Sequence, residues 1–254
     1  KTQFNICRSP KSYNSQLGVA LSVLELNLSH TLAIFEAGIS HPDEMQQLES
    51  IIKPTIGVFT GVGDAHQQNF KTLEDKIIEK FKLFKDVKTL IQNTEQLINL
   101  DIPFTDLASI QNANLVFSTA KCFVVNEATI HKQLAVLPTI SMRMERMQGK
   151  NGNVIINDAY TFNEKSLEIG INYLNQLSEN NDRTKIVIIA PSKRVVLTTD
   201  SIALLNSSAI DRVILIGDEN NQLIKLQAYY PNVNEFIEAN LSFSESNILM
   251  TGAR

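Results

Sequence analysis

Short, nearly continuous apolar runs alternate along this chain with longer stretches in which apolar residues recur at helical spacing. Apolar runs without a period of two are typical of parallel strands that are covered on both faces. The runs that predict strands are Phe4–Cys7, Thr31–Phe35, Ile56–Thr60, Lys88–Gln92, Asn153–Ile156, Lys185–Ala190, Arg212–Ile216 and Asn247–Met250. The stretches that predict helices are Gln16–Leu26, Pro42–Ile52, Leu73–Lys85, Ser109–Phe123, Glu127–Leu137, Ser166–Leu177, Ser201–Asn206 and Gln222–Tyr230. This alternation predicts βαβ units and an α/β fold with a doubly wound, mostly parallel sheet.

One stretch interrupts this alternation between two patterned regions. Residues Ser141–Asn151 are mostly polar and contain Gly149, and such a stretch favours a connection between domains. The length of 254 residues also suits two domains, at roughly 100–200 residues each. We therefore expect one domain over residues 1–142 and a smaller α/β domain over residues 143–254.

Composition and charge narrow the class of protein. Hydrophobic residues make up 43% and charged residues 20% of the chain, which is ordinary for a globular protein. The formal net charge of −4 argues against a general nucleic-acid-binding surface, which needs a basic excess. No apolar run approaches the roughly 20 residues that cross a bilayer, so we expect no membrane insertion. Cys7 and Cys122 lie far apart and fit no metal spacing, which favours a reduced, cytoplasmic setting.

Polar residues directly after the predicted strands are candidate site residues, because open α/β sheets bind ligands beyond the carboxyl ends of their strands. Glu36 closes one strand and is followed by Gly38; a carboxylate there suits Mg²⁺ near phosphates, although an ordinary loop residue fits as well. Gly61 and Gly63 follow the next strand and allow a ligand to approach the backbone. His66 can bind a metal or an anion, or can simply cap a loop.

Two further places carry residue types that chemistry uses. Asp158 follows the strand Asn153–Ile156 and can orient a ribose hydroxyl or a metal-bound water, or can form a turn or a helix cap. Lys76, Lys80 and Lys82 lie among acidic residues on one predicted helix. A solvent-exposed helix face with ion pairs between residues i and i+4 explains these lysines. Their spacing alone does not indicate that any one of them has a function.

Taken in order, these pieces resemble the Mur ligases, which use ATP to join amino acids or dipeptides to a UDP-linked muramoyl peptide. The resemblance runs over nearly the whole chain and rests on the order and spacing of its motifs. These motifs are Arg8–Val19, Glu36-Ala37-Gly38, Pro42-Asp43-Glu44, Lys53-Pro54, the turn ending in His66, Asn69-Phe70, Ser109–Ala113, Arg143-Met144-Glu145, Asp158-x-Tyr160 with Asn163, and Thr251–Arg254. The resemblance implies a central, ATP-binding domain of the P-loop NTPase type over residues 1–142, incomplete at its N-terminus, and a Rossmann-like C-terminal domain over residues 143–254.

The resemblance also implies roles for single residues. Glu36 and His66 fall where the family holds Mg²⁺, and Lys80 falls where many members carry a carbamoylated lysine that helps to bind a second Mg²⁺. His66 and Lys80 are therefore the expected catalytic residues. The residues expected to contact the nucleotide are Asn112, Arg143, Asp158, Tyr160 and Asn163. Asn14 is expected to face the muramoyl-peptide substrate.

Within the family, the run Arg8–Gln16 and the Asp-x-Tyr motif most resemble the ligases that add D-alanyl-D-alanine to a UDP-muramoyl-tripeptide, especially the form fused to an alanine racemase. This implies ATP and Mg²⁺ as cofactors, the UDP-muramoyl-peptide and D-alanyl-D-alanine as substrates, and an acyl phosphate as the intermediate. A sister enzyme on the same fold, such as one using folylpolyglutamate, is an alternative against which the same run argues.

One family motif is missing from the position where it is expected. The phosphate loop, Gly-x-x-Gly-Lys-Thr, should precede the first strand by one helix, and only Lys1-Thr2-Gln3 precede Phe4. We therefore expect these 254 residues by themselves to bind ATP poorly. A non-catalytic module that holds a fused or partner racemase is the alternative to a ligase. The encoded sequence upstream of Lys1 discriminates between the two.

Overall fold

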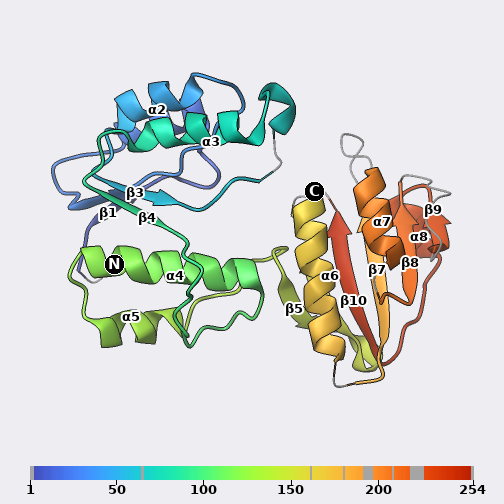
Figure 1. Ribbon diagram of the computed structural model, residues 1–254. Helices are drawn as coiled ribbons and strands as arrows, with labels where there is room; N and C mark the ends of the chain where they lie inside the picture. Colours follow the sequence, from blue (N-terminus) through green and yellow to red (C-terminus); the bar gives the residue numbers. More distant parts are fainter. Residues whose placement is uncertain are drawn as a thin grey trace. The chain divides into compact units, whose positions relative to one another are not determined.

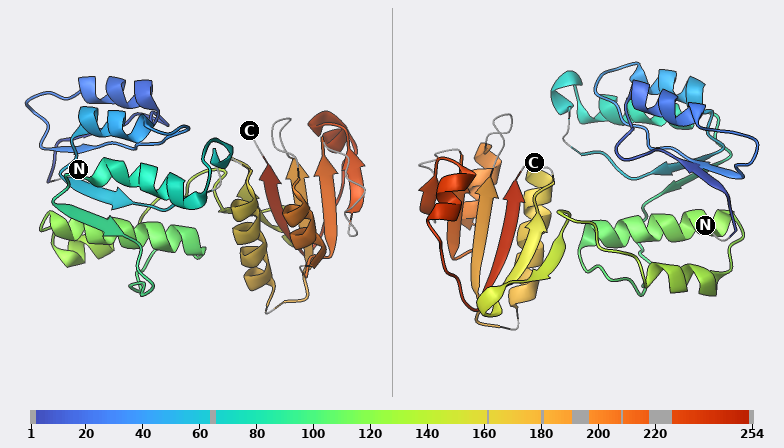
Figure 2. Two further views of the ribbon diagram at one scale, coloured as in Figure 1. Left: turned by 45° about the horizontal axis from the view of Figure 1, so that its top comes forward. Right: turned by 180° about the vertical axis from the view of Figure 1, so that it is seen from behind.

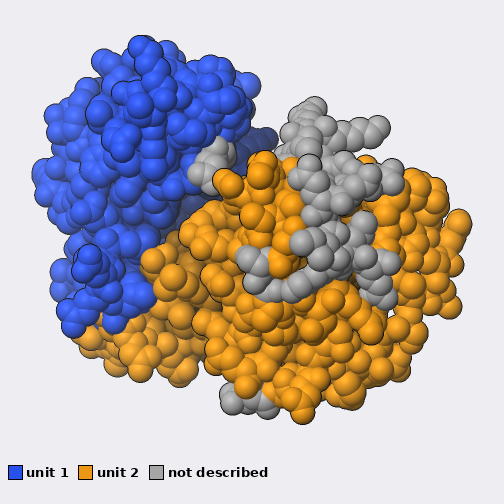
Figure 3. Space-filling model, turned by 45° about the vertical axis from the view of Figure 1, so that its right-hand side comes forward, with its two compact units in different colours: residues 1–97, 114–125 blue, residues 98–113, 126–254 orange. Residues whose placement is uncertain are grey.

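The computed structural model describes residues 3–63, 66–160, 162–179, 181–190, 197–207, 209–217 and 226–252. The chain divides into two compact units. Unit 1 consists of residues 1–97 and 114–125, and unit 2 of residues 98–113 and 126–254 (Figure 3). Helix α4 (Leu107–Cys122) contributes residues to both units. The domain boundary expected after residue 142 stays a prediction.

Unit 1 alternates short strands with helices, as the sequence predicts. Its elements are β1 (Ile6–Arg8), α1 (Gln16–Leu24), β2 (Leu32–Ile34), α2 (Glu44–Ile52), β3 (Ile56–Phe59), the 3-10 helix η1 (Gln67–Asn69), α3 (Leu73–Phe81), the 3-10 helix η2 (Lys82–Phe84) and β4 (Thr89–Gln92). Strand β1 pairs with β2 and β3 pairs with β4, both in parallel. The strands of unit 1 therefore form two parallel pairs among the described residues, where the sequence suggests one sheet.

The core of unit 1 lies between its helices and the loops that follow its strands. Val19 of α1, Met45 and Leu48 of α2, and Phe70 just before α3 are buried together with Ile39. Helices α2 and α3 lie side by side along the β3–β4 pair (Figure 1). Because this core uses residues from loops as well as helices, it also anchors the loops at the carboxyl ends of β2 and β3.

Unit 2 contains a six-stranded sheet in the order β5-β6-β10-β7-β8-β9. Its elements are α5 (Glu127–Leu134), β5 (Glu145–Gln148), the 3-10 helix η3 (Lys150–Gly152), β6 (Val154–Asp158), α6 (Glu164–Ser178), β7 (Thr184–Ala190), α7 (Thr199–Ser207), β8 (Arg212–Ile216), β9 (Leu226–Tyr230), α8 (Val233–Glu238) and β10 (Ser246–Gly252). The edge strand β5 runs antiparallel to β6, and the other pairs are parallel. The α/β class with a mostly parallel sheet is therefore confirmed.

Both faces of this sheet are covered, which explains why its strands are continuously apolar. Val187 and Ile189 of β7 pack with the residues of α6 and α7. Ile186 and Ile188, which alternate with them, pack on the opposite face near Phe236 of α8. Figures 1 and 2 show α6 and α7 on one face and α8 on the other. Successive side chains of a strand point to opposite faces, so a strand buried on both faces needs apolar residues at every position.

The structure differs in three places from what the pattern indicates. The helix predicted over Gln222–Tyr230 is wrong where the chain is described: residues 226–230 form strand β9, and residues 222–225 lie outside the described residues. The stretch interpreted as a connection, Ser141–Asn151, contains the edge strand β5. Helix α8 is not predicted by the pattern, because it is short and begins at the Asn232 cap after a proline.

Candidate functional site

Three predicted site residues of unit 1, Asn14, Glu36 and His66, lie in loops that follow strands, and hydrogen bonds join these loops. Asn14, in the loop after β1, donates from Nδ2 to Oε1 of Glu36 at 2.8 Å. The backbone oxygen of Asn14 accepts from the N–H of Gly38 at 2.8 Å. Ser9 Oγ accepts from the N–H of Glu36 at 3.1 Å. The structure therefore brings Asn14 and Glu36 together, at the carboxyl ends of β1 and β2, and leaves the Glu36 side chain exposed.

A second hydrogen bond joins the loop after β2 to the loop that carries His66. Asn69 Nδ2 donates to the backbone oxygen of Ser40 at 2.8 Å. His66 is exposed and has a positive φ of 63°, and η1 begins directly after it. Gly61, at the start of the same loop, has a φ of +123°. Asp64 and Ala65, between Gly61 and His66, lie outside the described residues. Two of the three predicted metal-binding residues, Glu36 and His66, thus lie in adjacent loops that a hydrogen bond joins.

The predicted catalytic lysine lies on α3, which follows the His66 loop. Thr72 caps this helix, because its Oγ1 accepts from the N–H of Asp75 at 3.0 Å. Burial, and then the positive charge of Lys76, lower the pKa of Lys80 below its usual value. Desolvation disfavours the ammonium form, so Lys80 is more easily neutral, and thus a better nucleophile, than a surface lysine.

The interpretation of this helix face as solvated is wrong for two of its residues. Lys76 is 2% exposed and Glu79 is 4% exposed. Lys82 forms ion pairs with Glu79 at 2.6 Å and with Asp43 at 3.0 Å, and its pKa is raised, first by the hydrogen bond to Glu79. Sequence reasoning missed the burial of Lys76, since one lysine among several gives no sign of which is covered by a neighbouring loop.

In unit 2, several predicted nucleotide-binding residues gather at the end of β6. Asp158 is 9% exposed, and its Oδ1 accepts from the N–H of Met144 at 3.2 Å. Burial raises the pKa of the Asp158 carboxyl, although the Met144 hydrogen bond and the charge of Arg143 act in the opposite direction. The guanidinium carbon of Arg143 lies 4.3 Å from the centre of the Tyr160 ring. This stacking holds a cation beside the buried carboxylate.

The last strand adds a residue that sequence reasoning did not select. Thr251 on β10 is paired in register with Asp158 on β6. Thr251 is 3% exposed, and its Oγ1 has no hydrogen-bond partner in the described part of the chain. A buried hydroxyl without a partner is costly, and it indicates a place where another group completes the hydrogen bonding. The available signal was that Thr251 stands at the carboxyl end of a predicted strand.

The other two predicted nucleotide-binding residues lie in the same unit but make different contacts. Asn163 caps α6: its Oδ1 accepts from the N–H of Ser166 at 2.8 Å, and Ser166 Oγ accepts from the N–H of Asn163 at 3.2 Å. This capping box occupies the side-chain oxygen of Asn163 and leaves only the side-chain NH₂ group for a ligand. Asn112 is exposed on α4.

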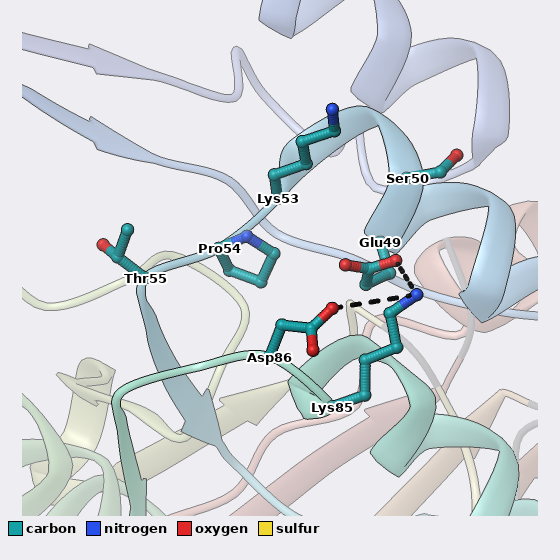
Figure 4. Close-up of a pocket in the computed structure, with 7 residues that line it drawn as sticks. All are labelled: Glu49, Ser50, Lys53, Pro54, Thr55, Lys85 and Asp86. Carbon is teal, nitrogen blue, oxygen red and sulfur yellow. Dashed lines mark ion pairs between the residues drawn. The ribbon is translucent and has the colours of Figure 1, made fainter.

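A hollow of about 450 Å³ is found elsewhere in unit 1 (Figure 4). It lies at the end of α2 and before the amino ends of β3 and β4, and its lining includes Glu49, which pairs with Lys85 at 2.7 Å. Because ligands of such sheets bind at the opposite, carboxyl ends, we assign no part of the reaction to this hollow. Within the described ranges, no three His, Cys, Asp or Glu side chains are grouped as a metal site, and no helix is long and apolar enough to cross a membrane.

Comparisons with known proteins identify the family and the fold of the chain. The sequence model of a protein family, the Mur ligase middle domain, matches residues 1–133 of the chain. The UDP-N-acetylmuramoyl-tripeptide–D-alanyl-D-alanine ligase of Buchnera aphidicola from Acyrthosiphon pisum is 21% identical over 84% of this chain and 58% of its own length. The chain thus spans little more than half of that relative.

Two solved structures show the same fold. The UDP-N-acetylmuramoylalanyl-D-glutamyl-2,6-diaminopimelate–D-alanyl-D-alanyl ligase of Acinetobacter baumannii matches with a TM-score of 0.79 and 17% identity, over 100% of this chain and 68% of its own. The MurF ligase of Thermotoga maritima in complex with ADP matches with a TM-score of 0.76 and 16% identity, over 99% of this chain and 70% of its own. Since the middle-domain model covers more than half of the residues, the chain belongs to the Mur ligase family.

Proposed function

We propose that the protein is an ATP-dependent amide ligase that adds D-alanyl-D-alanine to a UDP-N-acetylmuramoyl-tripeptide. The observation that carries this proposal is the Asn14–Glu36 pair, at the carboxyl ends of β1 and β2 in a chain with a Mur ligase middle domain. The names of the relatives support the same reaction: the Buchnera protein is named for it, and the Thermotoga structure holds ADP.

The end of β6 suits a nucleotide. Asp158 and Thr251 are buried at paired positions of β6 and β10, and Thr251 Oγ1 lacks a hydrogen-bond partner among the described residues. Two such groups are the usual partners of sugar hydroxyls, because a carboxylate accepts and a threonine hydroxyl both donates and accepts. Arg143, stacked on Tyr160, supplies a positive charge for phosphate oxygens. We therefore assign Asp158, Thr251, Arg143 and Tyr160 to nucleotide binding, with Asn112 and Asn163 as further contacts.

The loop cluster of unit 1 suits Mg²⁺ that is held partly by phosphates. Asn14 occupies one oxygen of the exposed Glu36 carboxylate and leaves the other available. Mg²⁺ is commonly bound by one or two carboxylates together with substrate phosphates, so a larger cluster of acidic residues is not needed. We propose that Glu36 and His66 hold one Mg²⁺, and that Lys80, once carbamoylated, helps to hold a second. Mg²⁺ would supply positive charge that neutralises the phosphates.

The residues of the chain itself would act mainly by positioning and by electrostatics. The terminal carboxylate of the tripeptide attacks the γ-phosphorus of ATP, which forms the acyl phosphate and releases ADP. The amine of D-alanyl-D-alanine then attacks the acyl carbon, and inorganic phosphate leaves as the amide forms and the amine loses its proton. Asn14 holds Glu36 in place and faces the muramoyl peptide, while Arg143 offsets negative charge on the phosphates. Pre-organised charges of this kind lower the barrier without reorganisation during the reaction.

The sequence also left open a non-catalytic scaffold, a fused racemase and a cytoplasmic location. The relatives reported above are named as ligases, which does not favour a non-catalytic scaffold. Fusion to an alanine racemase stays a prediction, which the encoded sequence on either side of these residues decides. A cytoplasmic location also stays a prediction.

The proposed function is tested by measuring ADP release from the protein as it is encoded. We expect release only when UDP-muramoyl-tripeptide and D-alanyl-D-alanine are both present with ATP and Mg²⁺. Lys80→Ala should lower the rate by at least about a hundredfold, since general acid–base or charge-stabilising groups typically contribute that much. The exposed Lys71 is a matched control, and Lys71→Ala should keep the wild-type rate. ADP release without D-alanyl-D-alanine would contradict the assigned reaction, and full activity of Lys80→Ala would remove Lys80 from the site.

A further inference from the structure

Lys76 is a charged residue in a place where an apolar one would be expected. It is the largest of the fully buried side chains of the described residues, with 2% exposure. Burial of an ammonium group is costly unless polar partners replace water. A methionine of similar length would fill the same space without that cost. The contacts of the ammonium group therefore indicate what the charge does.

Two of these contacts lie at the two ends of the loop that carries His66. Lys76 Nζ donates to the backbone oxygen of Gly63 at 2.6 Å. The same nitrogen lies 5.9 Å from the centre of the Phe70 ring, which is itself buried. Gly63 precedes His66 and Phe70 follows η1, so one side chain of α3 contacts the loop on both sides of His66.

The beginning of this loop has little packing of its own. A Cβ atom placed on Gly61 or on Gly63 would meet no atom within 4 Å. His66 has a left-handed backbone conformation, with φ of 63°. A non-glycine residue in this region is strained, and it persists when surrounding contacts hold it. The charge-assisted hydrogen bond from Lys76 holds Gly63, three residues before His66, and bonds of this kind are stronger than neutral ones.

We propose that Lys76 is a positioning residue of the ligase site, which holds Gly63 and Phe70, on either side of His66, against α3. The proposal rests on the proposed function, in which His66 contributes to Mg²⁺ binding. Lys76 itself touches no substrate in this scheme. It acts through the loop, while Asn69 ties the other side of the same loop to Ser40.

The test compares wild type, Lys76→Met and the exposed control Lys71→Met by hydrogen exchange without ligands. The N–H groups of Asn69 and Phe70 donate to the backbone oxygens of His66 and Gln67 at 3.1 and 3.0 Å, so their exchange reports on the loop. We expect exchange about tenfold to a hundredfold faster in Lys76→Met, the change that corresponds to the loss of one hydrogen bond to a charged group. Lys71→Met should exchange as wild type does.

A second measurement separates positioning from general stability. The Mg²⁺ concentration that gives half-maximal ADP release should rise at least about tenfold in Lys76→Met, whereas the KM for D-alanyl-D-alanine should stay the same. Unchanged exchange at Asn69 and Phe70, or an unchanged Mg²⁺ requirement, would overturn the proposal. If Lys76→Met does not fold, Lys76→Gln is measured instead, and failure of both variants to fold would assign Lys76 to the core alone. If wild type releases no ADP with its substrates, the proposed function fails, while the exchange measurement still decides whether Lys76 holds the segment at Phe70 in place.

Discussion

The glycines after β3 allow a test in which two substitutions differ in backbone conformation and not in crowding. Gly61 has a φ of +123°, and Gly63 is not among the residues with positive φ. Neither position has an atom within 4 Å of an added Cβ. Gly61→Ala should therefore cost roughly 1–3 kcal/mol through backbone strain alone. Gly63→Ala should be neutral, or should stabilise by about 0.4–1 kcal/mol, because alanine restricts the unfolded chain.

Urea unfolding followed by circular dichroism measures both effects under the same conditions. We expect a lower midpoint for Gly61→Ala, an unchanged or higher midpoint for Gly63→Ala, and the same slope for both. ADP release should fall in Gly61→Ala, since the strained loop carries His66, and should persist in Gly63→Ala. Equal losses of stability in the two variants would refute the assignment of strain to Gly61.

Three further predictions concern the charged and capping residues. The pKa of Asp158 is raised in the folded protein, so the folded protein loses stability as the pH rises from about 3.9 through the folded pKa of this residue. In thermal melts at several pH values, Asp158→Asn should therefore become more stable than wild type across that range. Its ADP release should fall. Asn163→Ala should lose about 0.5–2 kcal/mol in urea unfolding, and Asn163→Ser little, because serine also caps helices. Lys82→Met should destabilise the protein more than Lys165→Met in the same assay. The first change leaves the buried Glu79 carboxylate without its ion pair, whereas Glu168, the partner of Lys165, is exposed. Equal effects would contradict this reasoning.

Most of the order of elements was predictable from the sequence, because it depends on local pattern, whereas the roles of the site residues stay predictions. Strands such as Lys185–Ala190 are marked by continuous apolar runs. Glu36 directly follows such a run, and Asp158 comes two residues after another. The segment Gln222–Tyr230 was not predictable in the same way. Its apolar residues fit a helix as well as a strand, and pairing with β8 decided the conformation of residues 226–230.

In the candidate site, too, the sequence indicated single residues, whereas the tertiary structure decided which of them meet. The resemblance named Asn14 and Glu36 separately, and the structure shows that one holds the other by a hydrogen bond. Thr251 and Asp158 are far apart in the chain and meet because β10 inserts between β6 and β7. No periodicity encodes that insertion, since strand pairing depends on contacts between distant segments.

By itself the sequence determined the class of fold, the alternation of strands and helices, and the polar residues that stand at the ends of strands. Hydrophobic periodicity and turn residues carry this information, and they act over a few residues. Only the tertiary structure decided which lysine of α3 is buried, and which buried hydroxyl has no hydrogen-bond partner in the described ranges. Burial is set by the segment that packs over a residue, and for Lys76 that segment is the loop that carries His66.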